Sequence, residues 1–245
     1  MTTAPLYEVF SSIQGEASRV GERHLFVRVA GCDLECVFCD TPASRRIPAC
    51  SRIHLPSGVR EEPNPVSASR LDAWVGRLDR EAGPHHAVAL TGGEPLLFVD
   101  YLRPLAQSWR NRGWTILLET GGHRPADLER ILDAVDVVMA DIKIASSAGL
   151  ATRRGTVSEF LRLARRKELA VKVVVNEETT AAEVRRVARL VAAEAPEAPL
   201  VLQPVSGRRF GPPSGDHLLA LQRSGLRIHS GVRVIPQTHR FLHVR

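Results

Sequence analysis

The sequence contains no long apolar stretch. No uninterrupted apolar run reaches about 18 residues, the length at which a helix begins to span a bilayer, and no charged segment followed by an apolar leader stands at its start. These absences disfavour a membrane-spanning segment and a secretory signal. We therefore expect a soluble, cytoplasmic protein that does not bind membranes.

Cysteine is scarce as well. The chain has four cysteines, and three of them, Cys32, Cys36 and Cys39, fall in one short segment. This distribution does not resemble the disulfide framework of a small secreted domain. Clustered free thiols instead suit a reducing compartment, which agrees with a cytoplasmic location.

Lysine is almost absent, because the 33 basic residues are arginines apart from Lys143, Lys167 and Lys172. The formal net charge of +6 is spread along the chain rather than gathered in one stripe, so a solvated basic surface is favoured over a nucleic-acid partner. An acidic small substrate would suit the same charge. Lys143 and Lys172 lie in strand-like runs. In a chain that otherwise uses arginine, lysine at these positions indicates that a compact ammonium group is needed there and that a guanidinium cannot replace it.

The chain also lacks the glycine fingerprint of dinucleotide-binding folds. Strand-like runs alternate with segments of helical periodicity, which predicts a parallel sheet with crossover helices. With 44% apolar residues, the 245-residue chain can form one α/β domain over residues 1–245, and we expect a partial (β/α) barrel of about six parallel strands. The expected strands are His24–Ala30, His86–Thr91, Thr115–Thr120, Val135–Lys143, Ala170–Asn176, Leu200–Pro204 and Leu226–His229. The expected helices are Ala68–Arg80, Tyr101–Arg112, Pro125–Ala134, Val157–Lys167, Ala181–Ala195 and Gly215–Ser224.

One segment, at about residues 42–67, interrupts this alternation. It carries five prolines and little periodicity, so we expect an irregular insertion. Cys50 lies inside it. An incidental free thiol is the favoured interpretation of Cys50, because a mobile loop is a poor place for a cluster ligand.

Four motifs directly follow or end predicted strands, where the chemistry of a (β/α) barrel is located. The first is the C-x3-C-x2-C motif of Cys32, Cys36 and Cys39. Three thiolates at this spacing can hold three irons of a cubic cluster and leave the fourth iron open to a small molecule. A zinc knuckle is the alternative, but zinc usually takes four protein ligands and no second cysteine pair follows. The other three motifs are Thr91-Gly92-Gly93-Glu94-Pro95, Glu119-Thr120-Gly121-Gly122 and Asp141-Ile142-Lys143.

The cysteine motif and the Gly-Gly-Glu-Pro motif together resemble the radical S-adenosylmethionine superfamily. The resemblance implies a [4Fe–4S] cluster held by Cys32, Cys36 and Cys39, with S-adenosylmethionine on the open iron. It implies that Phe38 packs on the adenine and that the Gly92–Glu94 loop meets the methionyl amino group. Further cofactor-binding residues implied by the resemblance are Glu119, Thr120, Asp141, Ile142, Lys143 and Lys172. Gly121 stands where the family more often has serine.

Four other segments narrow the resemblance to the 7-carboxy-7-deazaguanine synthase family. They are Glu8–Glu16, Phe26–Cys32, Cys39–Thr41 and Pro236–Arg240. Members of that family are lyases that carry out a radical-mediated ring contraction of 6-carboxy-5,6,7,8-tetrahydropterin to 7-carboxy-7-deazaguanine with loss of ammonia, a step of queuosine-type deazapurine biosynthesis.

The same resemblance implies the substrate-binding residues. Glu16, supported by Ile13, Gln14 and Gly15, would accept the donors of the pterin edge, and Arg28 would hold the substrate carboxylate. Thr41 would supply a hydroxyl ligand to Mg²⁺, a cation that prefers oxygen ligands. Further substrate contacts implied in this way are Thr91, Gln237 and His239.

The family also implies a homodimer and an electron donor such as flavodoxin, with no nucleic-acid partner. Two alternatives remain at this point. A radical activase acting on a partner protein would share the cluster and the Gly-Gly-Glu-Pro loop, and a zinc-containing RNA-binding protein would use the basic surface.

Overall fold

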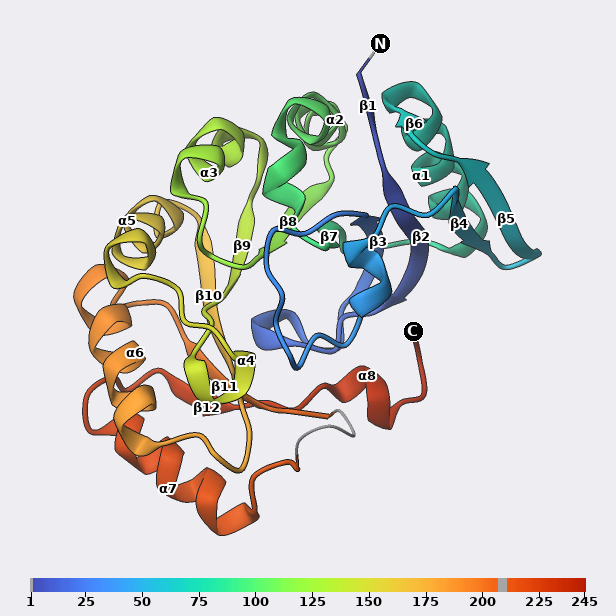
Figure 1. Cartoon of the computed structure of the whole chain (residues 1–245). Helices are drawn as coiled ribbons and strands as arrows, with labels where there is room; N and C mark the ends of the chain where they lie inside the picture. Colours follow the sequence, from blue (N-terminus) through green and yellow to red (C-terminus); the bar gives the residue numbers. More distant parts are fainter. Residues whose placement is uncertain (1, 207–210) are drawn as a thin grey trace.

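A strongly curved sheet determines where every candidate site residue lies. The computed structural model describes residues 2–206 and 211–245. The main sheet has ten strands in the order β12-β11-β10-β9-β8-β7-β3-β2-β4-β5 within this part of the chain. Figure 1 shows helices α2, α3, α5, α6 and α7 along the outside of the curve, while the loop after β3 and the C-terminal segment lie on its inside.

Seven neighbouring strands of the described chain are parallel to one another. They are rich in valine, leucine and alanine, and all but the edge strand β12 are largely buried on both faces, as strands of a covered parallel sheet are. They are β3 (Arg23–Val29), β7 (Ala87–Gly92), β8 (Thr115–Thr120), β9 (Val137–Asp141), β10 (Glu168–Val175), β11 (Leu200–Pro204) and β12 (Val232–Val234).

The crossover helices begin at recognisable caps. The Ser67 hydroxyl accepts from the Arg70 N–H at the start of α1, and Thr180 with Glu183 forms a capping box at the start of α6. The α-helices are α1 (Ala68–Ala82), α2 (Val99–Asn111), α3 (Pro125–Ile131), α4 (Ala145–Ala148), α5 (Arg154–Ala164), α6 (Ala181–Glu194), α7 (Gly215–Leu226) and α8 (Thr238–Phe241). The 3₁₀ turns are η1 (Ala17–Arg19), η2 (Pro42–Arg45), η3 (Pro95–Phe98) and η4 (Leu132–Ala134).

The partial (β/α) barrel predicted from the sequence is confirmed, with one strand placed wrongly. Leu226–His229 is not a strand, because α7 continues to Leu226 and Ile228 N–H donates back to the Gly225 carbonyl in the turn that ends the helix. The strand that follows is β12, and it pairs with β11.

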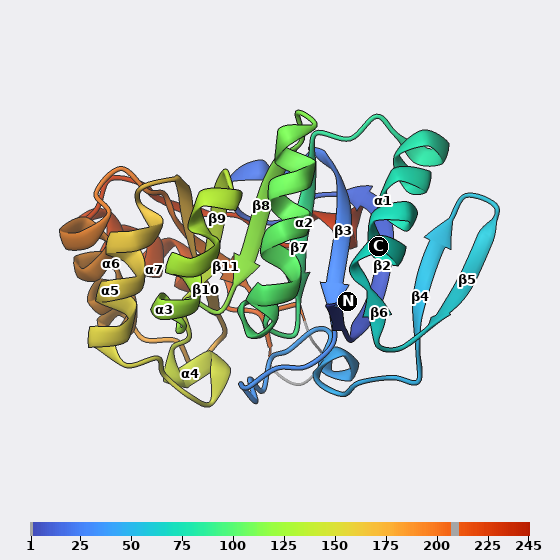
Figure 2. The ribbon, with the colours of Figure 1, turned by 90° about the horizontal axis from the view of Figure 1, so that it is seen from above.

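The expectation of an irregular segment at about 42–67 is also wrong for most of its length. Strands β4 (Cys50–Leu55) and β5 (Gly58–Pro63) form an antiparallel hairpin, seen at the edge of the sheet in Figure 2. The hairpin extends the sheet through β2 (Leu6–Ile13), which pairs with β3 on one side and with β4 on the other. A separate two-stranded ribbon joins β1 (Thr3–Ala4) to β6 (Val66–Ser67).

Most of the apolar core lies between the sheet and its helices. Trp109, Phe160, Leu102 and Ile116 are fully buried there. A smaller cluster on the inner side of the curve contains Phe10 together with Phe26, Leu117 and Met139, among others. No helix in the described residues has the length and apolar character needed to cross a membrane.

Candidate active site

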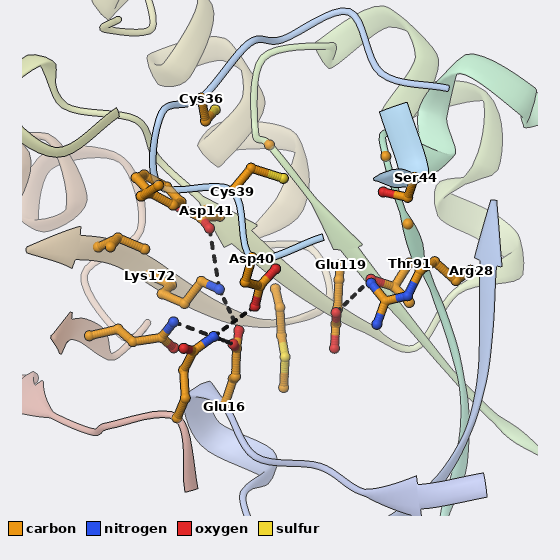
Figure 3. A pocket seen from close by; sticks show the side chains of 18 of the residues that line it. Glu16, Arg28, Cys36, Cys39, Asp40, Ser44, Thr91, Glu119, Asp141 and Lys172 are labelled. Carbon is orange, nitrogen blue, oxygen red and sulfur yellow. Dashed lines mark hydrogen bonds and ion pairs between the residues drawn. The ribbon is translucent and has the colours of Figure 1, made fainter. Parts of the chain in front are cut away.

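A cavity of about 600 Å³ lies at the carboxyl-terminal ends of the parallel strands (Figure 3). Its wall brings together strand ends, the cysteine loop, the segment after β2 and the C-terminal segment. The residues predicted from the sequence that line it are Ile13, Gln14, Gly15, Glu16, Arg28, Cys32, Cys36, Phe38, Cys39, Thr91, Gly92, Gly93, Glu94, Glu119, Thr120, Asp141, Lys143, Lys172, Gln237 and His239.

Two predicted site residues do not line this cavity. Ile142 is 4% exposed in the apolar core, and its N–H donates to the Lys172 carbonyl, 2.8 Å away. Thr41 precedes η2, and its hydroxyl donates to a carboxylate oxygen of Asp40 at 3.1 Å. Asp40 itself lines the cavity, so Thr41 touches the site through its neighbour.

The three clustered cysteines face the cavity from the loop that follows β3. All three are free thiols, and the Cys32 sulfur accepts a hydrogen bond from the Leu34 N–H at 3.4 Å. Cys50 is the first residue of β4 and is not part of the cavity wall. The described site therefore offers three sulfur ligands, with the fourth cysteine elsewhere.

Two glycines allow the β7 loop to press against the cysteine loop. A Cβ on Gly93 would lie 2.0 Å from the Gly31 oxygen and 3.1 Å from the Cys32 Cβ. Gly92 has a φ of +137°, a conformation that side chains disfavour, and a Cβ there would lie 2.4 Å from the Val29 oxygen. A side chain at Gly93 would push the two loops apart, and one at Gly92 would push the β7 end away from Val29 at the end of β3.

Glu94 ties the same loop to the end of β8. Its carboxylate accepts from the Thr120 hydroxyl at 2.7 Å, from the Gly121 N–H at 2.9 Å and from the Leu96 N–H at 3.0 Å. The Glu94 side chain is 1% exposed, and burial raises its pKa. The Glu94 carboxyl group and the Thr120 hydroxyl thus hold the loop in place at the cavity wall.

Glu119 connects residues predicted for cofactor and for substrate. One carboxylate oxygen accepts from the Gln14 amide at 2.7 Å. The other accepts from the Thr91 hydroxyl at 2.7 Å (Figure 3). Three different strands or loops are therefore fixed to one another at the cavity wall.

Two lysines and two carboxylates form a charged network on the opposite wall. Lys172 Nζ lies 2.5 Å from a Glu16 oxygen and 3.2 Å from Asp141, and Lys143 Nζ lies 2.9 Å from the same Asp141 oxygen. Burial raises the pKa of Asp141, but the two ammonium groups outweigh it and the net shift is downward. Burial lowers the pKa of Lys172, but Asp141 and Glu16 outweigh it and the net shift is upward. Both groups are therefore charged at neutral pH.

Lys143 also meets the cysteine loop. Its ammonium lies 4.9 Å from the centre of the Phe38 ring, within range of a cation–π interaction. The ammonium of Lys143 thus contacts both Asp141 and Phe38, which agrees with the expectation that a compact cation is needed at this position.

The C-terminal segment closes over the loop that carries Glu16. Gln237 donates its amide both to Glu16 at 2.6 Å and to Asp40 at 2.9 Å. The Thr238 N–H donates to the Gly15 carbonyl at 2.9 Å, and a Cβ on Gly15 would lie 2.2 Å from His239 Nδ1. The segment predicted to approach the substrate thus packs on the Gln14–Glu16 turn.

Several residues of the cavity wall were not predicted from the sequence, Gln203 and Arg245 among them. Gln203, at the end of β11, is 2% exposed and points its amide N–H at Glu16, 3.3 Å away. Its position at a strand end, after an apolar run, was the signal that could have identified it. Arg245 lines the cavity from the far end of the chain, and no local pattern marks it.

Comparisons with known proteins agree with this geometry. Residues 26–189 match the sequence pattern of the radical SAM superfamily. A 7-carboxy-7-deazaguanine synthase of Geobacter sulfurreducens is 39% identical over 98% of this chain and 97% of its own length. One of Methanothermobacter thermautotrophicus is 34% identical, over 99% of this chain and 98% of its own length. The chain belongs to the 7-carboxy-7-deazaguanine synthase family of radical SAM enzymes.

Solved structures support the fold of this family member. The crystal structure of QueE from Escherichia coli has a TM-score of 0.63 at 20% identity, over 96% of this chain and 94% of the other. The structure of TYW1 with a lysine-pyruvate adduct has a TM-score of 0.56 at 14% identity, over 84% of this chain and 74% of the other.

Radical SAM enzymes use a [4Fe–4S] cluster and S-adenosylmethionine, and the residues of this chain fit both. Three cavity-facing thiols match three cluster irons and leave one iron for a small molecule. Burial raises the pKa of Cys32 and Cys36, so cluster binding has to displace thiol protons. Membership in this enzyme family disfavours both the activase and the zinc-containing RNA-binding protein.

Proposed function

We propose that this enzyme converts 6-carboxy-5,6,7,8-tetrahydropterin to 7-carboxy-7-deazaguanine with loss of ammonia. The relatives named for that product cover nearly the whole chain. The observation that carries the proposal is that Glu16, Gln14 and Arg28 line the same cavity as the cysteine loop. A pterin held by these residues would lie beside the reactive centre.

Glu16 suits the aminopyrimidinone edge of the pterin, which presents adjacent N–H donors. An ionised carboxylate accepts about four hydrogen bonds, so the contacts with Lys172, Gln237 and Gln203 leave about one acceptor position on Glu16. The Gln14 amide, held by Glu119, and the backbone from Ile13 to Gly15 complete this edge. On this proposal Thr91, Gln237 and His239 are further substrate contacts.

The cofactor side of the cavity is assigned to the cysteine loop and the ends of β7, β8 and β9. When bound, the cluster and S-adenosylmethionine supply the one-electron chemistry that starts the rearrangement. The protein supplies position, because the Gly92–Gly93 backbone, Phe38 and the Asp141–Lys143 pair surround the space beside the cysteines. Glu119 and Thr120 hold the strand ends that form this wall, and Lys172 joins it to Glu16.

An anaerobic assay tests the reaction directly. The protein is reconstituted with iron and sulfide, reduced with dithionite and given S-adenosylmethionine, Mg²⁺ and 6-carboxytetrahydropterin, and products are followed by mass spectrometry. We expect 7-carboxy-7-deazaguanine. Cleavage of the cofactor without that product would contradict the substrate assignment and leave the family intact.

In the same assay, Glu16→Gln should raise the KM for the pterin by about tenfold or more, because a charge-assisted acceptor is replaced by a neutral amide. Reductive cleavage of S-adenosylmethionine without substrate should persist. Ser146→Ala, a change at an α4 hydroxyl that contacts Thr179 outside the cavity, serves as the control and should leave KM unchanged. An unchanged KM in Glu16→Gln would remove Glu16 from the substrate site.

Magnesium is a further part of the proposal, with Thr41 as a protein ligand. Its hydroxyl contacts Asp40, and hard oxygen donors of this kind suit Mg²⁺ together with water and the substrate carboxylate. Thr41→Ala should raise the Mg²⁺ concentration needed for half-maximal activity, while Thr41→Ser should behave as wild type. If alanine leaves the magnesium dependence unchanged, the ligand assignment is wrong.

We also propose a domain organisation, a cellular location and partners for the enzyme. We assign residues 1–245 to one domain, because β2 and the β4–β5 hairpin continue the main sheet. The free thiols support a reducing, cytoplasmic location. We also infer that a small acidic protein such as flavodoxin donates the electron. The enzyme is proposed to be a homodimer.

A further inference from the structure

A buried carboxylate beside the cavity has three positively charged or ionisable partners. Glu8, on β2, is 4% exposed. It accepts from Arg28 Nε at 3.0 Å, from Arg245 Nη1 at 2.7 Å and meets His54 Nε2 at 3.2 Å. These partners come from β3, from the end of the chain and from the hairpin strand β4. A buried carboxylate with this many partners fixes their positions.

Both arginines lie against the same aromatic ring, that of Phe10. The guanidinium of Arg28 is 5.6 Å from the centre of the Phe10 ring, and that of Arg245 is 5.8 Å from it. Phe10 is itself stacked on Phe26, with ring centres 4.9 Å apart. Phe10, Phe26, Arg28 and Arg245 all line the cavity, whereas Glu8 lies behind them. The two guanidiniums are therefore presented to the cavity in a fixed arrangement.

Each arginine keeps donors free for a ligand. Within residues 2–206 and 211–245, Arg28 uses Nε and Arg245 uses Nη1 in side-chain hydrogen bonds, so other N–H groups of both forks are available. The Ser12 hydroxyl donates to the main-chain carbonyl of Arg245 at 2.6 Å, which anchors the residue to β2. Arg245 is thus held in place by both its backbone and its side chain.

The third partner of Glu8, His54, carries no charge. Burial lowers the pKa of His54, and the positive charge of Arg245 lowers it further, so His54 is neutral at neutral pH. Arg28 and Arg245 thus bring two guanidiniums to one Glu8 side-chain carboxylate. The N–H groups of both arginines that Glu8 does not use suit a carboxylate, which planar guanidinium forks bind in bidentate fashion.

We propose that Arg245 is a specificity residue that binds the carboxylate of the pterin substrate together with Arg28, and that Glu8 positions both guanidiniums. This inference rests on the proposed function. It also gives the β4–β5 hairpin a role, since His54 supports Glu8 from the side opposite the cavity wall.

Binding measured with two ligands tests the subsite. The reconstituted enzyme with S-adenosylmethionine bound is titrated anaerobically with 6-carboxytetrahydropterin and with tetrahydropterin, which lacks the carboxylate. Arg245→Gln should weaken binding of the carboxylated pterin by about tenfold, the loss expected for one charge-assisted hydrogen bond, and leave tetrahydropterin binding unchanged. Arg245→Lys should retain part of the preference, because a lysine keeps the charge without the fork.

Two further variants distinguish a local effect from a general one. Arg60→Gln removes the same charge from the exposed strand β5 and should change neither affinity. Glu8→Gln should reduce the preference for the carboxylated ligand, and adding Arg245→Gln should reduce it by less than in the wild-type background, since the two residues act together.

The outcomes separate the subsite from the proposed function. If the wild-type enzyme forms the deazaguanine product and Arg245→Gln weakens both pterins equally, or neither, the subsite is overturned and the function stands. If the wild-type enzyme binds neither pterin, both are overturned. If Arg245→Gln weakens binding of 6-carboxytetrahydropterin and leaves binding of tetrahydropterin unchanged, the subsite is supported.

Discussion

Replacing Cys36 with alanine should leave a protein that binds no stable [4Fe–4S] cluster and forms no detectable product. Cys36 is 7% exposed and lines the cavity. Each of the three thiolates has to ligate one iron of the cluster. With two sulfur ligands remaining, the cluster would have two irons without protein ligands. Iron and sulfide content and the visible absorption after anaerobic reconstitution measure the loss.

Cys50→Ala is the matched control for this experiment. Cys50 is the first residue of β4 and lies outside the cavity wall, so its removal should leave cluster content and activity unchanged. Loss of the cluster in Cys50→Ala would show that Cys50 is a ligand and would contradict the three-cysteine site. A cluster retained in Cys36→Ala would contradict it equally.

The sheet could be predicted well where strands are buried on both faces. Thr115–Thr120 and Leu200–Pro204 were predicted to the residue, because continuous apolar runs bounded by polar motifs leave little freedom in their ends. The hairpin was missed although Ser51, Ile53 and Leu55 are buried in alternation with Arg52 and His54. That alternation marks a strand, but the surrounding prolines obscured it.

Some contacts of the site could be predicted from local sequence motifs, whereas others join residues that are far apart in the chain. The Gly92–Gly93 pair and the cysteine loop are consecutive motifs, so their proximity follows from neighbouring parallel strands. The partners of Glu16 are not local, since Gln203 is 187 residues away and Gln237 is 221 residues away in the chain. Polar contacts over such separations depend on the register of many strands, which no single motif contains.

Replacing Lys172 with methionine should destabilise the protein and impair cofactor use together. The ammonium lies between Glu16 and Asp141, whose side chains are 17% and 16% exposed, and its loss would leave both carboxylates without this cation. Removing one partner of a buried ion pair costs about 3 kcal/mol or more, which corresponds to a decrease in Tm of roughly 10 °C for a chain of this size. Thermal unfolding of the cluster-free protein measures the change. Lys167→Met, at the lysine outside the site, should leave Tm nearly unchanged.

The pH dependence of this difference follows from the two shifted groups. The pKa of Asp141 is lowered in the folded protein, so its contribution to stability is full above its unfolded pKa and is lost as the pH falls below about 4. The pKa of Lys172 is raised, so its contribution is full below its unfolded pKa and fades only above about pH 10.5. The Tm gap between wild type and Lys172→Met should therefore be constant from about pH 6 to pH 9 and narrow in acid. A gap that persists undiminished in acid would mean that Lys172 contributes packing rather than charge, and the network would then not be the reason for the lysine at this position.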